Sequence, residues 1–77
     1  MTREEFIAGL TELLEADPPL TGSEALAGLA NWDSLAAIGV MAMADDRCGI
    51  RLVPKRINSC QTVDDLVELV LGKRAAN

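Results

Sequence analysis

Ser34 is the residue of this chain whose sequence surroundings point most clearly to chemistry. It follows Asp33, a favourable helix N-cap residue, so we expect Ser34 at the first position of a helix that starts at Asp33. A helix N-terminus carries free N–H groups and a partial positive charge, which would favour a phosphate ester on the serine hydroxyl. Asp-Ser alone is also ordinary helix-capping chemistry. A serine hydroxyl is a poor nucleophile without a base, and the chain has no histidine, so a modified serine is favoured over a catalytic one.

The rest of the sequence gives little support for catalysis or metal binding. The two cysteines, Cys48 and Cys60, fall short of the four N or S ligands that a zinc site requires. We expect both to be small, buried or half-buried thiols. A Ser–Lys catalytic pair would need a pocket that a chain of this size hardly provides. We therefore predict that the chain is not an enzyme and has no metal site.

Length and charge limit the remaining possibilities. The 77 residues suit one domain, placed at 1–77, and the net charge is −5. Residues 1–46 hold nine of the twelve acids, whereas 47–77 hold six of the seven bases. The acidic total opposes nucleic-acid binding and favours partners with basic surfaces. No stretch approaches the roughly 20 apolar residues of a membrane span, and acids interrupt any secretory signal near the start. We expect a cytoplasmic monomer with reduced thiols.

The first helix and the loop after it are predicted from capping and spacing. Thr2 and Glu5 form a capping box, and the segment Ala16–Pro19 ends the helix. Residues 17–32 form a long connection with a short turn at 23–29. Apolar residues at helical spacing define the inward stripe of the helix, and leucines fasten the loop to the core. These residues are Phe6, Ile7, Leu10, Leu13 and Leu14 in the helix, and Leu20, Leu26 and Leu29 in the loop.

Three further helices are expected. The second runs from Asp33 to about Cys48, with Gly49 after it. Residues 50–53 form an extended connector, and a short third helix covers Pro54–Ile57 and ends at Asn58. The last starts at Thr62 with Asp65 as a capping-box partner and ends at Gly72; its inward stripe is Val63, Leu66, Val67 and Val70. Lys73 and Arg74 suit the negative end of its dipole, and residues 75–77 should fray.

The second helix has more apolar surface than one core contact requires. Residues 35–44 carry no charge. Ala37, Val40, Met41 and Ala44 can face inward, whereas Leu35, Ile38 and Ala42 lie on another face. That second face suggests a docking surface beside Ser34. The alternative is a helix that the long loop and the last helix bury on most sides.

These features together resemble the acyl carrier protein family. The resemblance covers nearly the whole chain and rests on Asp33-Ser34-Leu35 opening the second helix and Thr62-Val63-Asp64-Asp65-Leu66 opening the last. The Asp-Ser-Leu motif is weak alone, but its combination with this helix order, length and acidity is fairly specific. The resemblance implies an all-α four-helix bundle of acyl-carrier-protein type, with three main helices, one short third helix and a long first loop.

The resemblance also implies a cofactor and partners. A phosphopantetheinyl transferase, using coenzyme A and Mg²⁺, would attach 4′-phosphopantetheine to Ser34, and the terminal thiol would hold an acyl group as a thioester. Acyl-loading and acyl-processing enzymes would then use the carried group. Asp33 would cap the helix and help to hold the metal during transfer. Partner contacts would come from Leu35, Ile38, Ala42 and Asp45.

Several departures from the family pattern bear on the pathway. Asn31 stands where many members have glycine, and the middle of the second helix lacks the acids that fatty-acid carriers usually show. The region around the third helix is basic, where acids are commoner, so Lys55 and Arg56 are expected to contact acids on a partner. These residues favour a specialised pathway, such as polyketide or peptide synthesis, over primary fatty acid synthesis. A free-standing aminoacyl or peptidyl carrier would share Ser34, and an unmodified four-helix interaction module is the alternative from another class.

Overall fold

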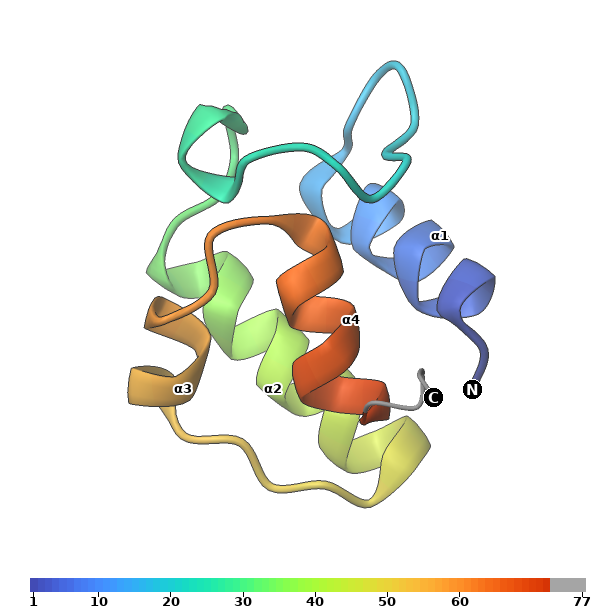
Figure 1. The fold of residues 1–77 in the computed structure, drawn as a ribbon, viewed down its shortest axis with the longest axis vertical. Coiled ribbons are helices and arrows are strands. Elements are labelled where there is room, and N and C mark those ends of the chain that lie inside the picture. The colour runs from blue at the N-terminus through green and yellow to red at the C-terminus, as the bar shows by residue number, and fades with distance from the viewer. Residues whose placement is uncertain (73–77) are drawn as a thin grey trace.

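The computed structural model describes residues 1–72; residues 73–77, which include the expected Lys73–Arg74 dipole contact and the expected frayed tail, lie outside the described part. Within it the chain forms four α-helices and one 3₁₀ turn and no strand (Figure 1). The predicted all-α, four-helix fold is therefore confirmed. The helices are α1 (Arg3–Leu14), α2 (Ser34–Cys48), α3 (Pro54–Asn58) and α4 (Val63–Leu71), and the turn η1 spans Leu26–Gly28.

Local capping sets the helix boundaries, largely as predicted. Thr2 and Thr62 each accept the backbone N–H three residues on, from Glu5 and Asp65, and both capping boxes are complete. The Asp33 carboxylate accepts from the Ala36 N–H at 2.9 Å, and Gly49 ends α2 in the left-handed conformation. α1 stops at Leu14, ahead of the expected segment, because Glu15 turns left-handed and its N–H bonds back to Glu12 and Thr11.

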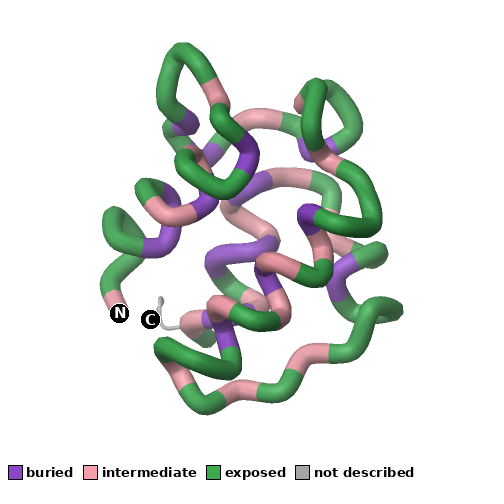
Figure 2. Tube along the Cα trace, turned by 180° about the vertical axis from the view of Figure 1, so that it is seen from behind, coloured by how far each residue is buried: buried purple, intermediate pink, exposed green. Residues whose placement is uncertain are grey.

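The core is aliphatic around one aromatic ring. α2 and α4 each pack against the other three helices. Figure 2 shows buried positions on the inner sides of the helices and exposed ones along the loops. The α4 stripe is buried as predicted, and so are Leu20 and Leu26 of the loop. The largest fully buried side chains are Phe6, Leu10, Ile57, Leu66, Val40, Val63 and Val70.

One expectation about inward residues was wrong, and another was incomplete. Val40 and Ala44 of α2 are buried and Ala37 and Met41 are half-buried against the core, as expected, but Ala36 is buried as well. Leu13, expected in the α1 stripe, is 41% exposed. Its side chain instead lies over Gly39 of α2, where a Cβ would come within 2.7 Å of it. The rotation of each helix about its own axis is set by packing against neighbours, which periodicity does not specify.

The long loop is fastened to the start of α4. Ala25 pairs with Thr62 in an isolated antiparallel bridge, and Val63 N–H donates to the Glu24 carbonyl at 3.0 Å. Asp64 N–H donates to the Gly22 carbonyl at 2.8 Å, and the Asp64 carboxylate pairs with Arg3 of α1 at 2.7 Å. Gly22 has φ 123°, which glycine adopts readily. The loop before Ser34 is thereby held against two helices.

Candidate functional site

Ser34 is the first residue of α2 and is exposed. Asp33 caps the helix at the Ala36 N–H, so the carboxylate points to the backbone. Within residues 1–72 the Ser34 hydroxyl has no hydrogen-bond partner. A free hydroxyl at a helix N-terminus is chemically available, and the field there favours a phosphate group on it.

The segment that leads to Ser34 is tied to α1 through Asn31. The Asn31 side-chain N–H donates to the Leu14 carbonyl at 2.6 Å. That carbonyl belongs to the last turn of α1, where backbone carbonyls have no N–H partner within the helix. The Trp32 N–H also returns to the Leu29 carbonyl at 3.2 Å. The sequence indicated only that Asn31 stands where many members of the resembled family have glycine. Its role as a clamp joins residues far apart in the chain, and no sequence signal marks it.

The outer side of α2 carries exposed apolar side chains. Leu35 is 75% exposed and Ile38 is 54% exposed, and Ala42 and Asp45 are exposed as well. The loop and α4 therefore leave this side of the helix uncovered. The four residues singled out from the sequence follow one another along α2 from its N-terminus, starting beside Ser34.

A second exposed surface is basic, and it surrounds α3. Residues 47–63 hold four cations and no acid, and we call Arg47, Arg51, Lys55 and Arg56 the basic segment. All four are exposed, and the ion pair found within residues 1–72 involves Arg3 instead. Val53, the N-cap residue of α3, is 54% exposed and was missed by the sequence reasoning. The sequence held one signal of this exposure, the position of Val53 just before Pro54. The exposure of a connector residue, however, depends on its tertiary contacts.

Other reactive groups do not gather at Ser34. Among the described residues no set of three His, Cys, Asp or Glu side chains could hold a metal ion. Both cysteines are free and half-buried, as expected. The Cys60 thiol donates to the Arg56 carbonyl at 3.6 Å, and burial, together with Asp65, raises the pKa of this thiol.

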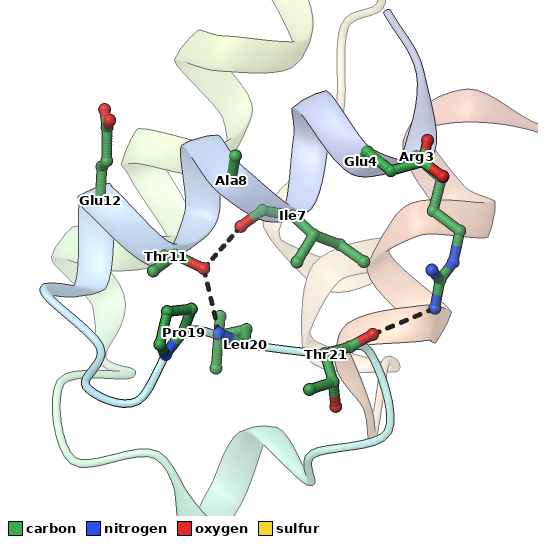
Figure 3. A pocket seen from close by; sticks show the side chains of 9 residues that line it. All are labelled: Arg3, Glu4, Ile7, Ala8, Thr11, Glu12, Pro19, Leu20 and Thr21. Atoms are coloured by element: carbon green, nitrogen blue, oxygen red, sulfur yellow. Dashed lines mark hydrogen bonds between the residues drawn. The ribbon is translucent and has the colours of Figure 1, made fainter.

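Another groove, with a volume of about 480 Å³, lies between α1 and the start of the loop (Figure 3). Thr11 lines this groove, and the Thr11 hydroxyl donates to the Ile7 carbonyl and accepts from the Leu20 N–H. Ile7 and Leu20 themselves belong to the core. The Thr11 hydroxyl is thus engaged in holding the loop to α1.

Over the described part, no helix is long and apolar enough to cross a membrane.

The fold and the site define a small helical protein with an exposed serine at the start of its second helix. Two curated proteins, each called acyl carrier protein, are similar to it over nearly their whole length. The protein from Micrococcus luteus is 24% identical, covering 96% of this chain and 98% of its own, and that from Myxococcus xanthus is 24% identical, covering 92% and 96%. Both similarities are consistent with the acyl carrier protein family. No family model and no solved structure matches it.

Proposed function

We propose that the chain carries acyl intermediates as thioesters on a 4′-phosphopantetheine arm attached to Ser34. The observation that carries this proposal is the exposed Ser34 hydroxyl, free of hydrogen bonds within residues 1–72, at the N-terminus of a capped helix. The names of the two curated relatives support the acyl carrier role itself.

The residues present fit such a group. The first turn of α2 contains no acidic residue, so a phosphate on Ser34 would meet the positive end of the helix without a carboxylate inside that turn. Asp33 precedes it and offers a carboxylate that a transferase-bound cation could share during attachment. When bound, the arm supplies a thiol that forms thioesters and a flexible tether that raises the local concentration of its cargo.

Partner enzymes would recognise two surfaces on the same carrier. Leu35, Ile38 and Ala42 offer apolar contact along α2, and Asp45 adds a charge near its end. Lys55 and Arg56 offer cations on α3, which packs against α2. Exposed apolar surface beside unpaired charge is typical of recognition surfaces. The proposed partners are a phosphopantetheinyl transferase and enzymes that load and process the acyl group.

The pathway we propose is a specialised one. The uncharged stretch 35–44 and the acid-free stretch 47–63 leave few acids for a partner with a basic docking surface to bind. An aminoacyl or peptidyl carrier would share these features and differ in its cargo. We further propose that residues 1–77 form one domain and that the protein is a cytoplasmic monomer.

Mass spectrometry tests the central claim. The purified chain is incubated with coenzyme A, Mg²⁺ and a broad-specificity phosphopantetheinyl transferase, beside a known carrier as a control. The expected result is the gain of one 4′-phosphopantetheine, lost in Ser34→Ala and kept in Ser23→Ala, which alters an exposed loop serine. No gain while the control carrier is modified would contradict the proposal and favour an unmodified interaction module.

A further inference from the structure

A shallow groove opens directly beside Ser34. Its volume is about 310 Å³, and we call it the Ser34 groove. Three parts of the chain form its walls: the end of α1, the last residues of the loop and the first turn of α2. Two of the lining residues are the immediate neighbours of Ser34 in the chain, so the groove lies within reach of a flexible group attached to that serine. The lining residues are Leu13, Glu15, Asn31, Asp33, Leu35 and Ala36.

The lining is chemically mixed in a way that suits a polar ligand with small apolar parts. Within residues 1–72 the Glu15 carboxylate accepts no hydrogen bond, and Asp33 uses one oxygen, Oδ1, for the Ala36 N–H. Both carboxylates can therefore accept from further N–H or O–H donors. Leu13 and Leu35 are 41% and 75% exposed and form apolar edges. A pantetheine chain has amide N–H groups, a hydroxyl and a pair of methyl groups, which match these features.

The walls of the groove are held in place before any ligand binds. Glu15 caps α1 in a left-handed conformation, with its N–H bonded to Glu12 and Thr11. Asn31 is fixed to the Leu14 carbonyl at 2.6 Å, and Asp33 is fixed to the first turn of α2. A preformed groove has little ordering cost on binding, so even a few hydrogen bonds would favour one position of a tethered chain.

We propose that the Ser34 groove binds the pantetheine part of the arm, with Glu15 and Asp33 accepting from its amides and Leu13 and Leu35 contacting its methyl groups. This inference rests on the proposed attachment at Ser34. It places the resting arm against the end of α1. Ile38, Ala42 and the basic segment are not part of the groove and stay uncovered for partner enzymes.

A nitroxide at the end of the arm tests this position. ¹⁵N-labelled protein is modified enzymatically with coenzyme A that already carries the nitroxide on its sulfur, so Cys48 and Cys60 need no labelling. Mass spectrometry first establishes the attachment. Amide intensities are then compared before and after reduction of the nitroxide. The expected result is the strongest intensity loss in residues 13–16 and at Asn31, with smaller losses in residues 50–58.

A matched pair of variants makes the test specific. Glu15→Gln weakens an acceptor in the groove and should reduce the intensity loss at Leu13 and Asn31. Glu12→Gln, one turn earlier on α1 and outside the groove, should leave it unchanged. Successful attachment with the greatest loss in residues 50–58, or with equal losses in both variants, would overturn the groove assignment alone. Failure of attachment, seen by mass, would instead contradict the proposed function and the inference with it.

Discussion

Leu13 of α1 occupies the space that a side chain at Gly39 of α2 would take. A Cβ at position 39 would lie 2.7 Å from Leu13 Cδ1 and 2.9 Å from Cδ2. A second contact runs the opposite way, because a Cβ at Gly9 of α1 would lie 2.9 Å from the Met43 sulfur of α2. Each of the two helices thus has a glycine at the point where a large side chain of the other helix packs against it. This close approach also brings Leu13 to the Ser34 groove.

The two glycines should respond differently to alanine. Each change gains helix propensity of about 1 kcal/mol. At Gly9 a flexible methionine can move aside, so Gly9→Ala is expected to stabilise the protein by up to about that amount. At Gly39 three atoms of Leu13 lie within 3.3 Å, so the gain should be largely cancelled. Urea unfolding of both variants measures the difference; a greater stability of Gly39→Ala would contradict this packing.

The Asn31 clamp should matter for both stability and modification. Asn31→Ala removes the hydrogen bond to the Leu14 carbonyl and is expected to cost about 0.5–1.5 kcal/mol. Asn31→Asp should cost more, because a carboxylate would face that carbonyl near the negative end of α1. Both variants should slow the transfer of phosphopantetheine by loosening the segment before Ser34. Denaturant unfolding and transfer rates provide the measurements, and equal stability of Asp and Asn at position 31 would refute the clamp.

Leu35 should affect recognition without affecting the fold. Its side chain is 75% exposed, so Leu35→Asp loses little burial, and an acid in the first turn of a helix is favourable. We expect the free energy of unfolding to stay within about 0.5 kcal/mol of the original, while kcat/KM for the transferase falls. Ala8→Asp, at an exposed position of α1, is the control for added charge. Unfolding of Leu35→Asp would place Leu35 in the core and contradict the exposed face.

The positive charge of the basic segment should act on partner enzymes by attracting their acidic residues. Lys55→Gln with Arg56→Gln removes two cations from α3 and should lower kcat/KM for the enzyme that loads the acyl group. The dependence of that rate on salt should weaken at the same time. The double variant Ala8→Glu and Ala27→Glu makes the same change in net charge at exposed sites outside the basic segment. Equal effects of the two double variants would show that only net charge matters.

Glu24 should make the loop sensitive to acid. Hydrogen bonds from the Gly22 and Thr21 backbone N–H groups lower the pKa of its carboxyl from the ordinary 4.5 to about 2. A lowered pKa in the folded state stabilises the protein above about pH 4.5, and this contribution is lost as the pH falls towards 2. Glu24→Gln should therefore lower stability at neutral pH and flatten its decline in this acidic window. Thermal unfolding across pH measures this, with Glu12→Gln as control; an unchanged slope would contradict the loop geometry.

Local sequence was sufficient for the helices and for the candidate serine. Thr2, Asp33 and Thr62 cap helices through contacts within three residues, so their roles were predictable from spacing. The exposed Ser34 follows from the same logic, since its place is set by Asp33. The connector before Pro54 forms no strand, and its last residue, Val53, is extended as predicted.

Tertiary structure alone decided which faces meet. The sequence placed Leu13 in the inward stripe of α1 and did not single out Ala36, yet packing buried Ala36 and placed Leu13 over Gly39. The same holds for the Asn31 clamp and for the Arg3–Asp64 pair, whose partners lie 17 and 61 residues apart. Capping and periodicity depend on neighbours along the chain and can be read from it. Helix rotation and cross-chain hydrogen bonds depend on how several helices fill one core, which no local pattern specifies.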